Sequence, residues 1–459
     1  MVNIYIEIIE SGKRPIFKAL CIRLMEILNT LRNFAYWSID ALKGGEVKKD
    51  FQDIEKIFGY TSFTSLKEHQ KPVLDNLLNA VVNNSTFYSG CKNYKSLSDF
   101  PIVNKSIIKD HFDDITFEDQ ESNYLPVKTS GSTGSPFSIF QTKRKKNRNT
   151  ADTLYFAKLA GYTLGEKLLY LRLWAAYYKK PKMIAWLQNT EQLEVSDLNN
   201  TYVKAMVDRL EKDKSPKGWI GYPSGFESIC KSLDALNAKP LDCNIKSIIA
   251  IAEGLSPEVK SKMEYYFKAP TVSRYSNVEN GIIAQQMPND NAFRINWASY
   301  VVEILNLESD VPVPNGTIGR IIITDLYNLA TPMIRYDTGD IGAFVNDENS
   351  TDNIPKLESI QGRKMDALYK TNGDMLNPFT MHAYVYDFPE IKQLQFIQHE
   401  EKKYEIKVNT NVMFEGESLL IEKFKNDIGK DAHVDIQYVD EIPSLKSGKR
   451  KISVNLYKQ

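Results

Sequence analysis

The sequence predicts an α/β protein with a large, multi-layer N-terminal domain and a small α+β domain at its C-terminal end. Between residues 127 and 338, short apolar runs such as KLLYLRLW, SIIAIAEGL and GRIIITDL alternate with helical segments such as SPEVKSKMEYYF. This alternation is typical of βαβ units and therefore of a layered α/β domain. After residue 362, the strand-like pieces QLQFIQHE, KYEIKVNT and HVDIQYVDEI flank one helical segment, ESLLIEKFKNDIG.

Domain boundaries follow from these changes in pattern. A chain of 459 residues is long enough for two or three folding units. We expect an N-terminal domain over residues 1–361, beginning with a mostly helical segment over about residues 1–120, and a C-terminal domain over residues 362–459. The join at residues 361–366 is a candidate hinge, because a hinge needs only a few residues.

Composition argues against several classes of protein. Lys+Arg and Asp+Glu are both 58, so the formal net charge is zero, whereas nucleic-acid binders usually carry a basic excess. The cysteines form no CxxC pair, so neither a zinc site nor a disulfide framework is expected, and we expect a cytoplasmic protein. The cysteines are Cys21, Cys91, Cys230 and Cys243.

The most apolar stretch near the N-terminus covers residues 17–42. Arg23, Glu26 and Arg32 interrupt it, so no membrane-spanning helix is predicted. Apolar residues recur there at helical spacing: Phe17, Leu20, Leu24, Ile27, Leu28 and Leu31. We expect this helix to pack on the main body. Peripheral contact with a membrane is the alternative, disfavoured by the acids in the same stretch. The acidic, β-branched start NIYIEIIESGKR predicts no cleavable signal peptide.

The stretch VKTSGSTGSPF (residues 127–137) is the most informative part of the chain. Its central residues are all Thr, Ser or Gly: Thr129, Ser130, Gly131, Ser132, Thr133, Gly134 and Ser135. Glycines let the backbone approach an anion closely, and hydroxyl and N–H groups donate to phosphate oxygens. The spacing fits neither GxxxxGK[ST] nor GxGxxG. The stretch therefore predicts a different kind of phosphate loop, with a polar linker as the alternative.

Companion motifs follow in order along the chain. TSGSTGSP resembles the signature loop of the adenylate-forming superfamily, which includes acyl-CoA synthetases, peptide-synthetase adenylation domains and luciferases. Five further stretches resemble that family's other motifs: AIAEGLSPEV (residues 250–259), SRYSNVENG (273–281), PMIRYDTGDIG (332–342), QGRKMDALYKTNGDMLNP (361–378) and IPSLKSGKRKISV (442–454). The closest likeness is to the phenylacetate–CoA ligase branch and its capsular-polysaccharide-biosynthesis relatives, supported by GYPSG at residue 221 and by DFPIVNKSIIKDHF.

The resemblance implies that ATP and Mg²⁺ convert a carboxylic acid into an acyl-AMP, with release of pyrophosphate. A large adenylate-forming domain and a small, mobile C-terminal domain are implied as well. The loop from Thr129 to Gly134 would bind the β- and γ-phosphates of ATP. Glu279 would ligate Mg²⁺, Arg363 would contact the ribose or phosphate side, and Lys449 would bring its charge to the α-phosphate.

The remaining implied contacts concern the nucleoside and the acid. The backbone of Glu253 and Gly254 would lie against adenine, and Tyr275, beside Ser276, would stack on the adenine ring. Asp340 would accept hydrogen bonds from both ribose hydroxyls. The substrate pocket is assigned only weakly, to residues near Tyr222, Ser224 and Ile251. This mix suits a small or aromatic acid, and an amino acid is less favoured because no Asp is placed to hold an amino group.

Several positions depart from the family pattern. Ser276 replaces a usual Gly, Val278 a usual Thr or Ser, and Met365, followed by Asp366, the usual hinge Asp. Phe137 stands where a Lys usually follows the loop, and the run at residues 143–146 is expected to be a solvated helix end. These departures leave the acyl acceptor open. It is CoA or a carrier-protein thiol, or else a sugar amine or hydroxyl in surface-polysaccharide assembly. A non-catalytic nucleotide-binding scaffold is the third alternative.

Overall fold

The structure of the chain is a computed structural model. It describes residues 15–457 except 118–123, 129–136, 175–178, 197, 347–352, 364–366, 377–380, 382–383, 385–386, 389, 411 and 444–450. The chain divides into two compact units with interleaved segments. The first unit contains Met1–Gln52, Thr150–Ile251 and Val259–Val272, and the second contains Asp53–Asn149, Ala252–Glu258 and Ser273–Gln459. The boundary expected between residues 361 and 362 stays a prediction.

The first unit is built on four parallel strands in the order β4-β3-β5-β6. They are β3 (Lys167–Arg172), β4 (Thr190–Glu194), β5 (Lys217–Gly221) and β6 (Ile245–Ile251). Strands β3, β5 and β6 are mostly apolar because helices cover both of their faces, whereas the edge strand β4 (TEQLE) is mostly polar. The apolar runs KLLYLRLW and SIIAIAEGL thus form strands, as the sequence predicts.

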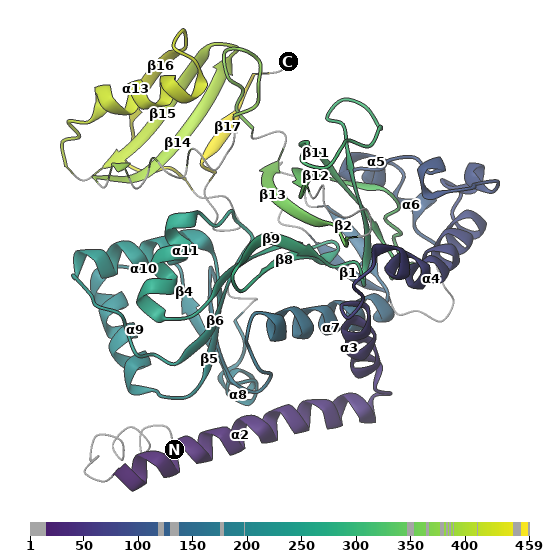
Figure 1. Cartoon of the computed structure of the whole chain (residues 1–459), viewed down its shortest axis with the longest axis horizontal. Helices are drawn as coiled ribbons and strands as arrows, with labels where there is room; N and C mark the ends of the chain where they lie inside the picture. Colours follow the sequence, from purple (N-terminus) through teal and green to yellow (C-terminus); the bar gives the residue numbers. More distant parts are fainter. Residues whose placement is uncertain are drawn as a thin grey trace. The chain divides into compact units, whose positions relative to one another are not determined.

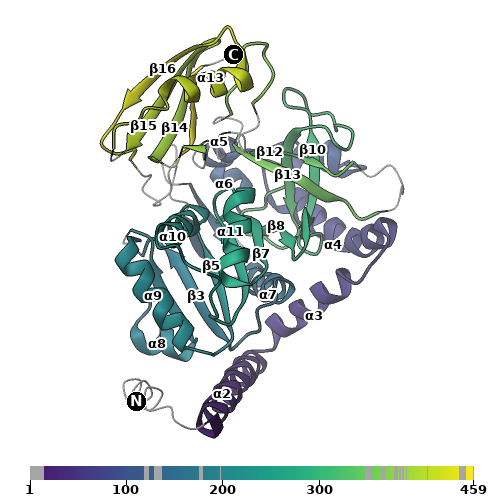
Figure 2. The same ribbon diagram turned by 60° about the vertical axis from the view of Figure 1, so that its left-hand side comes forward.

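Strand β5 shows how the two faces are covered. Trp219 contacts Phe226 and Phe267 edge-on, and these residues belong to α10 and α11 on one face. Ile220 points to the opposite face and packs with Ala157 of α7 in a small apolar cluster. The helices of this unit are α8 (Lys182–Leu187), α9 (Asn200–Lys212), α10 (Pro223–Ala235) and α11 (Pro257–Phe267), with the later part of α7 (Lys143–Leu159) (Figure 2).

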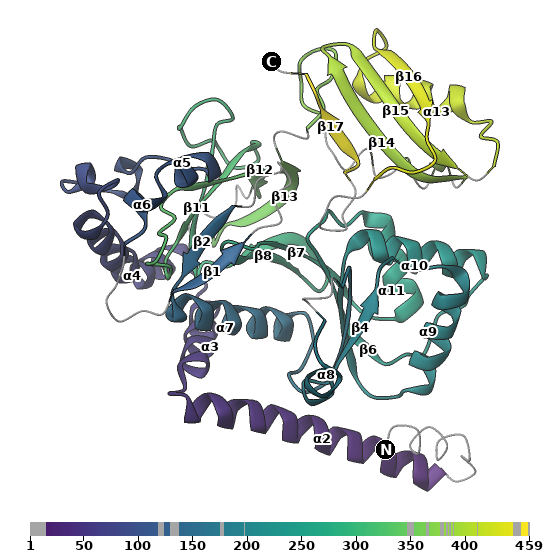
Figure 3. The ribbon, with the colours of Figure 1, turned by 180° about the vertical axis from the view of Figure 1, so that it is seen from behind.

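A long N-terminal helix, α2 (Pro15–Leu42), lies along the first unit, with α8 beside it (Figures 1 and 3). It packs on the body, as expected, but through its polar side. The Asn33 side-chain amide donates to the carbonyl of Leu164 at 2.9 Å. Leu24, Ile27, Leu28 and Leu31 are instead exposed. The regular spacing of these apolar residues therefore marks an outward face.

The second unit holds a run of antiparallel strands in the order β7-β8-β9-β13-β12-β11-β10. They are β7 (Thr271–Asn277), β8 (Gly281–Met287), β9 (Asp290–Ile295), β10 (Tyr300–Leu305), β11 (Gly319–Asp325), β12 (Tyr336–Phe344) and β13 (Lys356–Arg363). A separate hairpin pairs β1 (Leu125–Lys128) with β2 (Ser138–Gln141).

Several helices pack against these strands. They are α4 (Phe63–Asn84), α5 (Lys105–Asp110) and α6 (Phe112–Ile115), with 3-10 turns at Ser89–Cys91 and Leu97–Asp99, while α3 (Glu46–Ile57) connects from the first unit. Gln70 of α4 donates to the carbonyls of Trp297 and Tyr300 at 2.8 and 2.9 Å, which fixes α4 to the start of β10.

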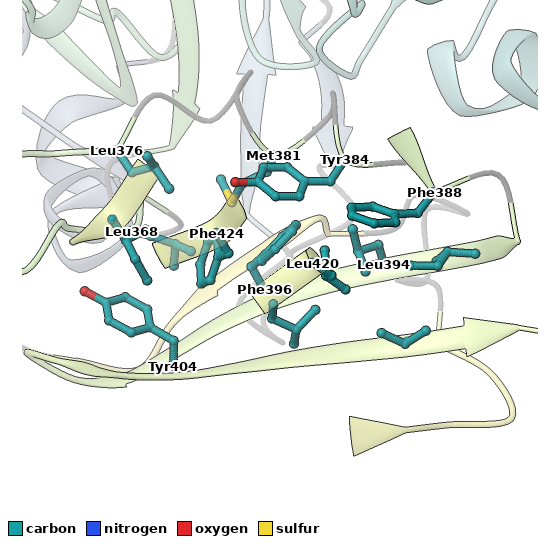
Figure 4. Close-up of a cluster of buried hydrophobic side chains, with 14 of the residues drawn as sticks. Leu368, Leu376, Met381, Tyr384, Phe388, Leu394, Phe396, Tyr404, Leu420 and Phe424 are labelled. Carbon is teal, nitrogen blue, oxygen red and sulfur yellow. The ribbon is translucent and has the colours of Figure 1, made fainter. Parts of the chain in front are cut away.

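The C-terminal part has the α+β composition that the sequence predicts. Its sheet has the order β16-β15-β14-β17, with α13 (Glu417–Ile428) against it. The strands are β14 (Ile391–Glu400), β15 (Lys403–Thr410), β16 (His433–Tyr438) and β17 (Ser453–Asn455). Tyr384, Phe396 and Phe424 meet in the core, and Figure 4 shows their rings between the sheet and the helix. The predicted fold class is confirmed. Among the described helices, none is long and apolar enough to cross a membrane.

Candidate active site

The sequence YDTGD forms the start of β12 and builds one half of the candidate site. Gly339 adopts a left-handed backbone (φ 77°), and its N–H donates to the Asp337 carboxylate at 2.8 Å. Asp340 follows, with its N–H bonded to the Thr338 hydroxyl at 3.1 Å. Thr338 also donates to the carbonyl of Ile321 at 2.9 Å. These local bonds hold the carboxylate of Asp340 in a defined direction.

Asp340 pairs with a second residue of the predicted set. The Tyr275 hydroxyl donates to Asp340 Oδ2 at 2.7 Å, so β7 and β12 are joined although other strands separate them in the sheet order. Burial, and then the negative charge of Asp340, hold the pKa of Tyr275 well above its usual value. The phenol is therefore a protonated donor at neutral pH.

The turn between β7 and β8 places Glu279. Asn277 accepts the backbone N–H of Asn280 at 2.8 Å, and Gly281 has φ 108°, so the chain reverses tightly. A Cβ at Gly281 would lie 2.6 Å from Asn149 Oδ1, which requires glycine there. The turn directs Val278 outward, 58% exposed, and buries the carboxylate of Glu279.

Glu279 lies between a cation and a phenol. Lys105 Nζ is 2.8 Å from its Oε1, and the Tyr336 hydroxyl donates to the same oxygen at 3.0 Å. The Glu279 side chain is 3% exposed, whereas that of Lys105 is 39% exposed. Burial and the charge of Glu279 hold the pKa of Tyr336 well above its usual value. One side of this ion pair is thus closed by protein, and the lysine side opens to solvent.

The position of Lys105 follows from the segment before α5. Val103 forms a parallel bridge with Tyr336, with hydrogen bonds of 3.2 Å to the carbonyl of Arg335 and 2.8 Å from the N–H of Asp337. Asn104 then caps the helix by accepting the N–H of Ile107 at 3.0 Å, so Lys105 is the first helical residue. The bridge brings the helix start to the strand that carries Tyr336.

The β1–β2 hairpin connects the predicted phosphate loop to Glu279. Its register sets Lys128 opposite Ser138, which holds the two ends of the loop side by side. Gln141, at the end of β2, donates to the backbone carbonyl of Glu279 at 2.9 Å. Lys105 Nζ lies 5.7 Å from the ring centroid of Phe137. The residue before β2 therefore lies near Lys105, and the last residue of β2 contacts the backbone of Glu279.

Comparisons with known proteins concern the fold of the chain and its C-terminal domain. Residues 368–455 match the family described as the CapK C-terminal domain. The chain is similar to Protein CapK of Staphylococcus aureus, 23% identical over 443 residues, which is 90% of this chain and 94% of the relative. A solved structure of 2-hydroxyisobutyryl-CoA ligase in the postadenylation state with 2-HIB-AMP gives a TM-score of 0.64 at 16% identity, covering 84% of this chain and 90% of that one. The chain has the adenylate-forming ligase fold.

The same ligase with 2-HIB-AMP and CoA in the thioesterification state gives a TM-score of 0.54 at 17% identity, covering 86% of this chain and 91% of that one. The resemblance that the motifs predict is thus confirmed in the fold and in the C-terminal domain.

Other predicted residues of the chain lie in several places. Arg363 stands opposite Asp340 in the β12–β13 register. Ser276 follows Tyr275 on β7, and Glu253 and Gly254 follow β6 in a segment assigned to the second unit. Several predicted residues lie outside the described part of the chain: Thr129, Ser130, Gly131, Ser132, Thr133, Gly134, Met365, Asp366 and Lys449. Their roles stay predictions.

The three weakly assigned pocket residues belong to the first unit. Tyr222 is buried as the residue before α10, Ser224 accepts the Ser228 hydroxyl through its backbone carbonyl at 3.0 Å, and Ile251 ends β6. Tyr222 directly follows β5 and Ile251 is the last residue of β6, so both lie at the carboxyl ends of neighbouring parallel strands, where ligands of α/β sheets usually bind. Their part in a substrate pocket stays a prediction.

Sequence reasoning missed Lys105, Tyr336 and Gln141. Tyr336 stands next to the recognised TGD residues, and Lys105 lies in the stretch DFPIVNKSIIKDHF, so both were close to motifs already noted. The expectation of a solvated lysine run is wrong for Lys145. Its side chain is fully buried and lies 2.6 Å from Asp325 Oδ2, with the Tyr300 hydroxyl at 3.0 Å.

The described residues fit a nucleotide and a hard cation. The Glu279 carboxylate already lies beside an ammonium group, so the surroundings favour positive charge at this position, and Mg²⁺ prefers carboxylate and phosphate oxygens. Among the described residues, no cluster of three or more His, Cys, Asp or Glu side chains is arranged to hold a metal ion.

Proposed function

We propose that this protein uses ATP to activate a carboxylic acid as an acyl-AMP, with release of pyrophosphate. The observation that carries the proposal is the buried Glu279 carboxylate. It holds a solvent-accessible lysine next to the hairpin of the predicted phosphate loop, in a chain with the adenylate-forming ligase fold. The Tyr275–Asp340 pair supplies a second polar site in the same unit. ATP needs both kinds of site, the first for its phosphate groups and the second for its nucleoside.

The reaction requires two anions to approach each other. A carboxylate oxygen of the acid attacks the α-phosphorus of ATP, the new C–O–P bond forms, and the bond to the leaving pyrophosphate breaks with its electron pair. Positive charge and fixed orientation are what a protein supplies to such a step. Glu279 would hold a magnesium ion, which neutralises phosphate charge when bound. Lys449 and Arg363 are proposed to add cationic charge near the α-phosphate.

Asp340 and Tyr275 are proposed to hold the nucleoside. A carboxylate can accept a hydrogen bond from each ribose hydroxyl, and the Tyr275 hydroxyl orients that carboxylate. Because the phenol is anchored at its oxygen, the ring is held in place and can present a face to adenine. Binding and orientation of ATP would thus depend on one hydrogen-bonded pair of side chains.

Lys105 is proposed to replace the lysine that Phe137 displaces from the usual position after the loop. Its ammonium contacts Glu279 and lies near the Phe137 ring, and its side chain is partly exposed. When a metal ion binds Glu279, the lysine would be released toward the phosphates. The lysine would then add positive charge beside the departing pyrophosphate.

For the second half-reaction we propose a thiol acceptor, CoA or a carrier phosphopantetheine. The similarity to CoA ligases in fold supports this choice. The match to the CapK C-terminal domain favours a place in surface-polysaccharide assembly, with a sugar amine or hydroxyl as the competing acceptor. The acid itself is proposed to be small or aromatic.

ATP–pyrophosphate exchange tests this proposal. The full chain would be incubated with Mg²⁺, ATP, labelled pyrophosphate and a panel of aryl, short-chain, hydroxy, sugar and amino acids. Acid-dependent exchange is expected, and it would name the class of acid. Adding CoA should then yield a thioester, whereas transfer only to sugars would favour the competing acceptor. Tight ATP binding without exchange for any acid would support a nucleotide-binding scaffold instead.

A further inference from the structure

Helix α2 packs on the first unit through an unusual side. Its packed side carries Trp37, whose ring centroid lies 5.6 Å from that of Phe51, and polar residues that fix the helix. Asn29 accepts a hydrogen bond from the Asn189 amide at 3.3 Å, and Asn33 donates one to the carbonyl of Leu164. Asp40 is 8% exposed and accepts the backbone N–H groups of Val47 and Lys48 at 3.3 and 2.9 Å. Because these hydrogen bonds fix the helix, the polar side is the one committed to the body.

The opposite side of α2 is apolar and exposed. Its residues are Leu24, Ile27, Leu28, Leu31, Phe34 and Leu42, and Phe34 is 70% exposed. At about 100° per residue these positions share an arc of roughly 120°, which is one face of a helix. Charged residues of the described helix lie outside this arc. The helix is therefore amphipathic, and its apolar face is exposed in the part of the chain that the structure describes.

Helix α8 extends this surface. Met183, Ile184, Trp186 and Leu187 are all exposed on a helix of six residues, with Met183 at 70% and Trp186 at 61%. The guanidinium of Arg32 lies 5.9 Å from the Trp186 ring, which joins α8 to the edge of α2 (Figures 1 and 3). We call the exposed apolar residues of α2 and α8 named here the apolar platform. Contiguous exposed apolar surface of this kind marks an interaction site.

Charged residues at the border of the apolar platform are mostly basic. Within and beside the two helices, the basic residues whose side chains are described are Arg23, Arg32, Lys43, Lys179, Lys180 and Lys182, against the acids Glu26 and Asp40. Asp40 is buried and bonded to backbone N–H groups, so Glu26 is the exposed acid of this set. The border therefore carries a net positive charge.

We propose that the apolar platform binds the surface of an anionic lipid bilayer, with α2 in the plane of the membrane. An apolar face with a basic border and an exposed Trp is the pattern of helices that lie in the headgroup region. A second copy of the chain fits less well, because two-fold pairing would set the same basic borders against each other. Anionic headgroups match the charge of the border, and acyl chains match the apolar face.

Vesicle sedimentation of the full chain tests this inference independently of adenylation. Vesicles of phosphatidylcholine with phosphatidylglycerol should bind the protein, with binding weakened by salt, and vesicles of phosphatidylcholine alone should bind it far less. Replacing Leu31→Glu together with Phe34→Glu should lower partition at least about tenfold. Replacing Lys179→Gln and Lys182→Gln should lower it about fivefold for each charge removed.

Leu236→Glu is the matched control, because Leu236 is an exposed apolar residue of the same unit after α10. It should leave partition unchanged, and all variants should keep the wild-type melting temperature. The proposal would be overturned if the Leu31→Glu/Phe34→Glu variant bound the anionic vesicles as strongly as the wild type. So would absence of binding combined with a dimer in light scattering that the same variant dissociates, since that result would assign the platform to a second copy.

Discussion

Two clusters in the second unit each combine a lysine, a carboxylate and a tyrosine, but they differ in how far the lysine is exposed to solvent. Lys145 lies 2.6 Å from Asp325 and 3.0 Å from the Tyr300 hydroxyl, and Lys105 lies 2.8 Å from Glu279, which accepts the Tyr336 hydroxyl. The Lys145 side chain is fully buried, whereas that of Lys105 is 39% exposed. We call them the closed cluster and the open cluster.

The difference in exposure separates a structural role from a functional one. In the closed cluster, water cannot replace either partner, so the ion pair must persist for the fold to persist. In the open cluster, the carboxylate is buried while the lysine side chain reaches solvent, and we propose that a metal ion can take its place. A buried carboxylate with an exchangeable cation is what a metal-dependent phosphoryl site requires.

The largest expected effect concerns the closed cluster. Lys145→Ala leaves Asp325 as a buried, unpaired charge, which should lower the free energy of unfolding by about 3–5 kcal/mol. Urea denaturation would measure the change. Lys143→Ala is the control, because that side chain is exposed, and it should change stability by less than about 0.5 kcal/mol. If Lys145→Ala and Lys143→Ala had equal free energies of unfolding, the closed cluster would not have the structural role that distinguishes it from the open cluster.

Asp340→Asn should act on nucleotide binding. The substitution keeps the shape of the side chain and removes the charge, so hydrogen bonds worth about 1.5–3 kcal/mol to the ribose are weakened. We expect the dissociation constant for ATP to rise about 10- to 100-fold, measured by calorimetry, with little change in melting temperature. An unchanged dissociation constant would remove Asp340 from the nucleotide site.

Lys105→Gln sharpens the comparison from the open cluster. Turnover should fall about tenfold because a cation near the phosphates is lost. The Mg²⁺ concentration for half-maximal exchange should fall as well, because Glu279 no longer carries a competing ammonium group. A purely structural lysine would lower turnover without shifting the Mg²⁺ dependence, and Lys105→Arg should retain most of the activity.

Tyr275→Phe should give the smallest effect. It removes the hydroxyl that orients Asp340 and keeps the ring, so ATP affinity should fall by about 1 kcal/mol, or roughly fivefold. Tyr275→Ala, which also removes the ring, should lower the affinity for ATP further. If both variants bound ATP equally well, the ring would have no part in holding adenine.

Periodicity and motif order predicted most of the fold, because strands such as β6 and helices such as α11 are set by local patterns of apolar residues. The resemblance of the TGD sequence to a family motif likewise predicted Asp340 as a residue of the nucleotide site. The partners of these residues depend on tertiary contacts, and local patterns do not encode them. Lys145 stands among four consecutive basic residues that read as solvated, and only its approach to Asp325, distant in the sequence, makes it a buried residue.

The same limit applies to Lys105 and α2. Lys105 reaches Glu279 because Val103 bridges to Tyr336, a contact that no spacing in the sequence reveals. The apolar spacing in α2 correctly indicated a helix, and apolar residues usually mark the buried side. Asn33 and Asp40 reverse that rule here because their hydrogen bonds commit the polar side to the body.

Acid-dependent pyrophosphate exchange by the Glu279→Gln variant beside the wild type tests the central claim most directly. ATP binding and melting temperature would be measured on the same samples. We predict that the wild type exchanges with its acid, and that the variant, folded and still able to bind ATP, exchanges at least about 100-fold more slowly because its metal ligand is lost. Equal exchange by both proteins would contradict the account of the open cluster.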